Sequence, residues 1–239
     1  MRLDKFLTEM GMGSRSEVKQ GIRKGMAKVN GDVITKPEYK VTDDCHVEWK
    51  GILVDYVEYE YIMLNKPAGV ISATEDRRDH TVVDLITDAK RTDLFPVGRL
   101  DKDTEGLLLL TNDGQLAHQL LSPKKHVAKV YYAKVEGIMT EEDVKLFKEG
   151  IVIDEDFKAL PADLHILSKN DADGTSEIEL KIFEGKFHQV KRMVHAAGKE
   201  VVYLKRLSMG SLTLDDTLKP GDYRNLTKEE LEDLYDRSI

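Results

Sequence analysis

Several residue types that commonly define a class of protein are scarce in this sequence. Cys45 is the single cysteine, which excludes an internal disulfide and any metal site built from a cluster of cysteines. Trp49 is the only tryptophan, so the chain has little to offer as an aromatic platform for a sugar. The longest purely aliphatic run, Leu107 to Leu110, is far shorter than the roughly 20 residues that a membrane helix needs. The first residues are charged and unlike a signal peptide, so we expect a cytoplasmic protein without a membrane partner.

The charge of the chain is negative overall but unevenly distributed. The 239 residues, 41% of them hydrophobic, suffice for one or two globular domains and carry a net charge of −8. Residues 1–30 have a net charge of +4 and residues 181–209 of +5, whereas residues 136–156 and 215–239 are acidic. Phosphates respond to charge within a screening length of about 10 Å, so the acidic total does not exclude an RNA partner.

The amino-terminal residues predict a small unit of two helices and a hairpin. Ser14 and Glu17 have the spacing of a capping box that starts the second helix, and Asn30-Gly31 predicts a type I′ hairpin turn. Arg15, Lys19 and Arg23 recur every four residues along one face of that second helix. Such a stripe is more often a solvated face than a binding surface, so both interpretations stay open on the spacing alone.

The segment GRLDKDTEGLLLLTNDG, residues 98–114, contains the strongest candidate for chemistry. Asp101 follows an arginine closely and precedes a lysine, in a predicted loop between two buried strands, where catalytic side chains are common. The acidic residues of this loop imitate the start of a calcium site, but position twelve is Asn112 where a glutamate is required. A pair of carboxylates would also suit a glycosidase, and a solvated acidic turn is the ordinary alternative.

The rest of the chain predicts an α+β fold without an internal repeat. Strands are expected at 61–66, 70–74, 106–111, 129–135, 161–167, 176–183 and 200–206, and helices near 81–87, 115–121, 141–149, 187–197 and 228–237. The segment from about residue 50 to residue 59 is the expected linker. We therefore predict a first domain over residues 1–59 and a catalytic domain over residues 60–239.

Four sequence elements in the same order resemble the pseudouridine synthases that modify ribosomal RNA. They are GRLD with Asp101, the strand ending YIMLNKPAG at 61–69, the lysine and tyrosine of KVYYAKV at 129–135, and EGKFHQVKRM at 184–193. The pattern of residues 1–31 is similar to the RNA-binding module of ribosomal protein S-four, which accompanies this catalytic domain. The resemblance implies a mixed, largely antiparallel sheet with a central catalytic cleft and no cofactor or metal.

The resemblance also implies roles for individual residues. Asp101 is the catalytic carboxylate, either as a nucleophile at the sugar or as the base of an elimination. A buried carboxylate keeps its charge only beside a cation, for which the family pattern favours Lys191 over Arg192. Tyr131 is expected to stack on the uracil, and Asp103 is expected to be solvated and dispensable.

The remaining candidates are expected to contact RNA or to support the cleft. Arg99 is placed to fill the gap left by the flipped base, and Arg192 and His188 belong to the basic element near the active site. Arg15, Lys19 and Arg23 would contact phosphates, and Lys66 is included with the RNA-binding side chains as part of the scaffold around the cleft.

The element Phe187 to Arg192 is similar to the branch that modifies small-subunit (16S) ribosomal RNA. We therefore expect a monomer that acts on ribosomal RNA, within a partly assembled small-subunit particle. The alternatives are a large-subunit (23S) ribosomal RNA pseudouridine synthase and a non-catalytic RNA-binding protein of ribosome assembly.

Overall fold

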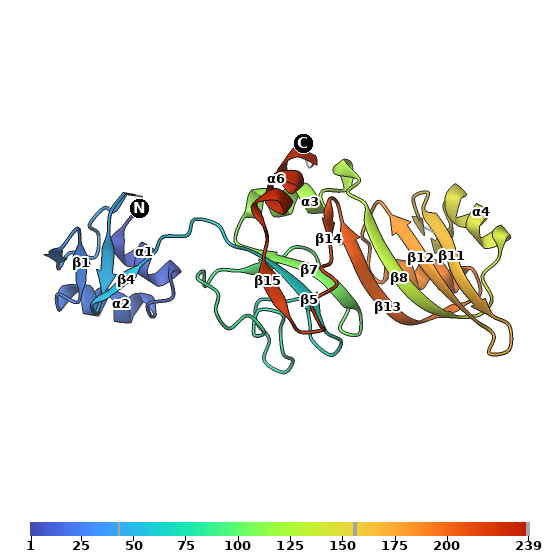
Figure 1. Ribbon diagram of the computed structural model, residues 1–239, viewed down its shortest axis with the longest axis horizontal. Helices are drawn as coiled ribbons and strands as arrows, with labels where there is room; N and C mark the ends of the chain where they lie inside the picture. The colour runs from blue at the N-terminus through green and yellow to red at the C-terminus, as the bar shows by residue number, and fades with distance from the viewer. Residues whose placement is uncertain (43, 155–156, 238–239) are drawn as a thin grey trace. The chain divides into compact units, whose positions relative to one another are not determined.

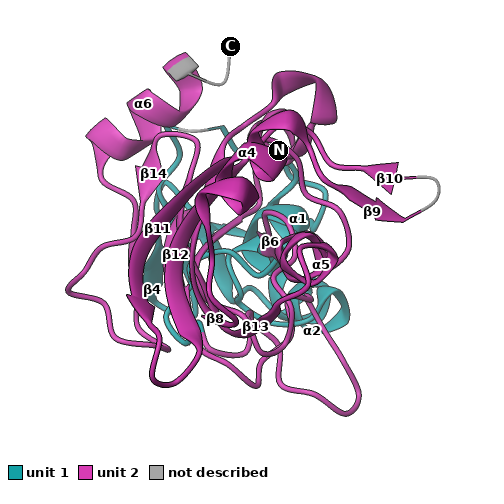
Figure 2. Ribbon diagram, turned by 90° about the vertical axis from the view of Figure 1, so that its right-hand side faces the viewer, with its two compact units in different colours: residues 1–60, 86–94 teal, residues 61–85, 95–239 magenta. Residues whose placement is uncertain are grey.

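The computed structural model describes residues 1–42, 44–154 and 157–237, which form two compact units (Figures 1 and 2). The first unit consists of Met1–Glu60 together with Ile86–Leu94, and the second contains the remaining residues. No helix among the described residues is long and apolar enough to cross a membrane.

The first unit combines two helices with a four-stranded antiparallel sheet. Its elements are α1 (Leu3–Glu9), α2 (Arg15–Arg23), β1 (Ala27–Val29), β2 (Asp32–Ile34), β3 (Val47–Trp49) and β4 (Ile52–Val54), with strand order β2-β1-β3-β4. The capping box of Ser14 and Glu17 is confirmed, and Asn30 and Gly31 both have the positive φ that a type I′ turn requires. Strand β4 lies within the segment expected to be a linker, because it completes the sheet beside β3.

The second unit is built on a large mixed sheet. Its main strands are β5 (Tyr61–Lys66), β7 (Glu105–Thr111), β8 (Lys129–Glu136), β11 (Asp163–Asn170), β12 (Thr175–Ile182), β13 (Glu200–Met209) and β15 (Tyr223–Asn225), in the order β11-β12-β8-β13-β7-β5-β15. The short strands are β6 (Phe95–Pro96) and β14 (Leu212–Thr213) at its margins and the separate pair β9 (Val152–Asp154) and β10 (Phe157–Lys158). The pairing of β13 with β7 is parallel, and the other pairings between the main strands of this sheet are antiparallel, which confirms the predicted α+β class.

Four α-helices and one 3₁₀ turn complete this unit. They are α3 (Gly114–Leu121), α4 (Glu141–Glu149), α5 (Gln189–Ala196), α6 (Lys228–Arg237) and the 3₁₀ turn Pro123–Lys125. Helix α5 packs against β13 through Val190, Met193 and Val194, which are buried. The same helix thereby brings its polar side chains to the middle of the sheet.

Strict alternation along β8 places two polar side chains on the buried face. Lys129 and Tyr131 share that face with the buried Ala133 and Val135, whereas Lys134 is exposed on the opposite face. The sequence pattern of this strand therefore determines which of its side chains lie on the buried face of the sheet.

Two predicted elements are wrong. Residues 70–74 form no strand, because Ile71 makes a single isolated bridge to Thr81. Residues 81–87 form only a turn. Thr81 and Asp84 exchange the hydrogen bonds of a helix start, but the following segment, Ile86–Leu94, belongs to the first unit. The sequence pattern at 81–87 favours a helix locally, but the contacts of the following segment with the first unit determine the path of the chain.

Gly106 allows the parallel strands β7 and β13 to approach closely. Its φ is +100°, and a Cβ at this position would lie 2.2 Å from the carbonyl oxygen of Arg206 and 2.8 Å from its nitrogen. A side chain here would push β7, which begins four residues after Asp101, away from β13, which carries Arg206.

We predict that Gly106→Ala destabilises the protein by at least about 2 kcal/mol, since the new methyl group meets backbone and the positive φ is strained. Gly114→Ala is the matched control, because its Cβ would meet open space at the start of α3. Alanine should stabilise that helix by about 0.5–1 kcal/mol. Thermal unfolding of both variants measures the difference, and equal melting temperatures would contradict the prediction.

Candidate active site

Hydrogen bonds from a preceding segment and within the loop itself fix the loop that carries Asp101. The hydroxyl of Ser72 donates to the carbonyl of Leu100 at 3.0 Å and accepts from its amide at 3.1 Å. The amide of Thr104 donates to the carbonyl of Asp101 at 3.1 Å, which closes a turn before β7. These contacts fix the backbone on either side of the carboxylate, so its position depends little on loop motion.

Lys66, expected among the RNA-binding side chains as part of the scaffold around the cleft, lies buried beneath the same loop. The side chain is 0% exposed, and its Nζ donates to the carbonyls of Pro67, Lys102 and Thr104 at 2.9–3.3 Å. Burial lowers the pKa of this lysine to about 8. With its three hydrogen bonds made inside the protein, Lys66 is a structural support of the catalytic loop.

The structure pairs Asp101 with Lys191 and not with Arg192. The Nζ of Lys191 lies 3.2 Å from Oδ2 of Asp101, and Nε2 of His188 lies 3.5 Å from Oδ1. The Asp101 side chain is 24% exposed, so it is partly shielded and open to the pocket on one side. A fixed cation stabilises the ionised carboxylate that either proposed route requires.

Lys191 pairs with Asp103 as well as with Asp101, a contact that the sequence did not predict. Its Nζ donates to both oxygens of Asp103 at 2.7 and 2.8 Å. Burial opposes the charge of Lys191, but the two carboxylates outweigh it and hold its pKa above the usual value. The ammonium in turn holds the pKa of Asp103 below its usual range. The Asp103 side chain remains 73% exposed, which agrees with the expected solvation.

The helix of the basic element begins later than predicted. Helix α5 starts at Gln189, and His188 caps it with a left-handed φ of +49°. His188 therefore does not continue the helical face of Lys191. Arg192 binds the carboxylate of Asp154, and His195 contacts Glu200, so each of the three helical side chains has its own carboxylate partner.

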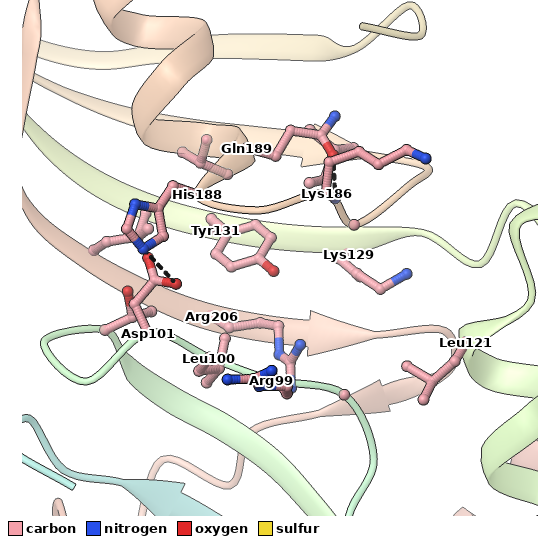
Figure 3. A pocket seen from close by; sticks show the side chains of 16 residues that line it. Arg99, Leu100, Asp101, Leu121, Lys129, Tyr131, Lys186, His188, Gln189 and Arg206 are labelled. Carbon is pink, nitrogen blue, oxygen red and sulfur yellow. Dashed lines mark hydrogen bonds and ion pairs between the residues drawn. The ribbon is translucent and has the colours of Figure 1, made fainter. Parts of the chain in front are cut away.

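A pocket opens beside Asp101 on the catalytic face of the sheet (Figure 3). Tyr131 lies across it, and Leu204 and Ile182 add apolar surface. Arg99, from the loop that carries Asp101, also lines the pocket and is exposed. An aromatic ring beside a fixed carboxylate suits a flat base attached to a sugar.

Sequence reasoning missed two cations of this pocket. Arg206 is 3% exposed and Lys129 is 7% exposed, and both line the pocket. Lys129 was noted only as part of a motif. Strand periodicity could have found Arg206, since it is spaced two residues from the inward Leu204.

The basic stripe of the first unit is not part of this pocket. Arg15, Lys19 and Arg23 belong to α2, whereas the pocket is lined by residues of the second unit. Arg15 and Lys19 line a separate hollow with Arg2, Asp4 and Lys5, and Lys19 lies 3.9 Å from the carboxylate of Asp4.

Family models match both units of the chain. The RNA pseudouridylate synthase model matches residues 60–196, and the S4 domain model matches residues 1–44. The fold and the site thus define an RNA-modifying isomerase. The chain belongs to the RNA pseudouridylate synthase family and carries an S4 domain at its amino-terminal end.

Similar proteins cover nearly the whole chain. An uncharacterized RNA pseudouridine synthase, YtzG of Bacillus subtilis, is 52% identical over 97% of both chains. The ribosomal large subunit pseudouridine synthase B of Bacillus subtilis is 42% identical (98% of this chain, 95% of the relative), and the ribosomal small subunit pseudouridine synthase A of Vibrio parahaemolyticus is 40% identical (98% and 100%). The crystal structure of a pseudouridylate synthase matches with a TM-score of 0.68 at 36% identity, over 98% of this chain and 99% of that one.

We predict that Lys191→Met lowers the single-turnover rate of pseudouridine formation by roughly 10- to 100-fold, because Asp101 loses its cation. Asp103→Asn should stay within about fivefold of the wild type, since an exposed ion pair is worth about 0–1 kcal/mol. Rapid-quench measurements on one RNA substrate compare the two variants. A larger loss in Asp103→Asn than in Lys191→Met would reverse the assigned importance of the two pairs.

Proposed function

We propose that this protein converts one uridine of ribosomal RNA to pseudouridine, with Asp101 as the catalytic residue and small-subunit RNA as the substrate. The observation that carries the proposal is the paired carboxylate of Asp101 at the mouth of a pocket that Tyr131 lines. Within this proposal, the protein acts as a cytoplasmic monomer on a partly assembled particle.

The proposed reaction rearranges bonds within one nucleotide. The bond between ribose C1′ and uracil N1 breaks, the base turns, and a bond forms between C1′ and C5, after which the proton on C5 is lost. Asp101 starts the sequence by attacking C1′ or by removing a ribose proton. Tyr131 would hold the base by stacking, because a phenol is a poor base near neutral pH.

The choice of small-subunit RNA rests on two observations. The element Phe187 to Arg192 resembles the branch that modifies this RNA, and several relatives named as small-subunit enzymes match over 97–98% of the chain at 36–40% identity. The large-subunit relative is slightly more similar, at 42% identity, so large-subunit RNA is the alternative that the experiment must separate.

The first unit is proposed to hold structured RNA through phosphate contacts. Arg15 and Lys19 lie beside one hollow of its surface, and Arg23 follows one turn further along α2. Arg99, His188 and Arg192 would contact RNA around the target uridine. Since Arg192 and His188 each lie near a carboxylate, RNA contact would compete with these pairs.

We predict that deleting the gene removes one pseudouridine from small-subunit ribosomal RNA and that wild-type protein restores it. Asp101→Asn should not restore it, because the isosteric amide cannot act as nucleophile or base. The purified variant should still bind RNA within a few-fold of wild type, since phosphate contacts dominate affinity. Loss from large-subunit RNA alone would favour the alternative substrate, and full activity of Asp101→Asn would overturn the catalytic assignment.

Replacing Arg15, Lys19 and Arg23 together by glutamine should weaken RNA binding and flatten its salt dependence. Each lost phosphate contact should reduce the slope of log K against log salt by up to about 0.7–0.9. The fold should survive, because the buried side of α2, Val18 and Ile22, is unchanged. An unchanged slope would return the stripe to a solvated face.

A further inference from the structure

Two buried cations face the pocket and neither takes part in the pairing around Asp101. Arg206, on β13, directs Nε to the carbonyl of Leu107 at 2.8 Å, and its Nη2 is buried without a hydrogen-bond partner among the described residues. Lys129, on β8, donates to the carbonyl of Val127 at 2.9 Å. Among the described residues, neither side chain forms an ion pair with a carboxylate.

This arrangement is unfavourable unless something negative occupies the pocket. Burying a cation without a counter-charge is costly, and a buried donor without an acceptor adds to that cost. Burial and, to a lesser extent, the nearby charge of Arg206 together lower the pKa of Lys129 to about 8. By contrast, the three basic side chains described above on α5 each lie beside a carboxylate.

The two ends of the pocket are oppositely charged. In Figure 3 the ring of Tyr131 lies between Asp101 on one side and Lys129 on the other, with Arg206 below the ring. Register supports this view, because Arg206 pairs directly with Tyr131 across β13 and β8. A nucleotide with its sugar at Asp101 and its base on Tyr131 would direct the base toward the cations.

We propose that Arg206 and Lys129 bind the oxygens of the uracil after it separates from the sugar and stabilise its negative charge. The proposal rests on the proposed function. When the bond between C1′ and N1 breaks, its electron pair stays on the uracil and is shared with the ring oxygens. Asp101 bonds to C1′ or has taken a ribose proton. The uracil then uses an electron pair at C5 to form the new bond to C1′. On the first route this bond displaces the Asp101 carboxylate from C1′, and on the second Asp101 returns the proton to the ribose. The C5 proton then leaves to solvent.

A base oxygen fits these cations better than a phosphate does. The two side chains are 3% and 7% exposed and stand deep on the sheet face, whereas Arg99 is exposed at the same pocket. The phosphates of an RNA strand stay with its backbone, which we expect to follow the exposed cation. The deep pair thus acts as an oxyanion site, in which fixed donors stabilise charge that develops during the reaction.

Binding of free bases tests the proposal without catalysis. Uracil is neutral near pH 7, whereas 5-nitrouracil is largely ionised. Any steric effect of the nitro group is the same for every protein variant, so a change in preference between variants reports on the charge. We expect the full-length wild type to bind 5-nitrouracil at least tenfold more tightly than uracil in calorimetry at pH 7. Lys129→Met and Arg206→Gln should lose most of this preference, and Arg206→Lys should keep part of it.

Lys134→Met is the matched control, since it removes the same charge from the exposed face of β8 and should leave the preference unchanged. Melting temperatures identify any variant that does not fold. If Arg206→Gln is unfolded, Lys129→Met and Arg206→Lys decide. The proposal is overturned if folded Lys129→Met keeps the wild-type preference. It is also overturned if the variants lose only the preference for uridine monophosphate over uridine, which would indicate a phosphate site.

Single-turnover rates separate this proposal from the proposed function. The two neutral variants should lose about 100-fold in rate while their affinity for RNA stays within a few-fold of wild type. A wild-type protein that forms no pseudouridine in any ribosomal RNA contradicts the proposed function. If the wild-type protein forms pseudouridine and the Lys129→Met and Arg206→Gln variants are equally fast, the oxyanion site formed by these two residues is contradicted and the proposed function stands.

Discussion

The buried ammonium of Lys66 is the contact on which the geometry of the catalytic loop depends. A lysine has three donors, and here the three converge on carbonyls of Pro67, Lys102 and Thr104 on either side of the loop that contains Asp101. An apolar side chain would fill the same space but would leave these carbonyls buried without donors. The lowered pKa of Lys66 shows what burial costs, and the neighbouring carboxylates partly offset that cost.

A second constraint acts beside the loop, where β7 and β13 approach each other more closely than a side chain at Gly106 would allow. The parallel contact of β7 and β13 depends on the missing Cβ of Gly106. It places Arg206 beside the start of β7, and Asp101 precedes that start by four residues. The loop is thus held by hydrogen bonds beneath it and by strand contact beside it, and the carboxylate inherits its position from both.

Electrostatic pairing explains why a protein with a net charge of −8 can still present cations to RNA. On α5 the cations are held in place by nearby carboxylates, as Arg192 is by Asp154. A pair of this kind holds the cationic side chain in place. Because an exposed ion pair contributes little stability, an RNA phosphate can replace the carboxylate as its partner. Local arrangement therefore matters more for RNA contact than the sum of charges.

The sequence predicted those features whose cause lies within a few residues. The capping box at Ser14, the alternation of residues 129–135 and the strand after Asp101 follow from local rules, and all three are present. Residues 70–74 and 81–87 carry the same kinds of local pattern but follow a path set by distant packing. The shared face of Leu204 and Arg206 follows from their spacing, but which face of β13 forms the pocket depends on the pairing of β13 with β8 and β7.

An isomerisation that returns a base to its own sugar places an unusual demand on a pocket. The base must separate from the sugar and turn without leaving the pocket. The site therefore has to attract the uracil while the contacts to the edges of its ring change during the rotation. A ring such as Tyr131 permits rotation within its plane, because stacking depends little on the angle about the stacking axis. Lys129 and Arg206 would attract the negative ring oxygens from one side throughout that rotation. Retention and rotation can thus coexist, since the attraction follows charge and does not require one fixed set of hydrogen bonds.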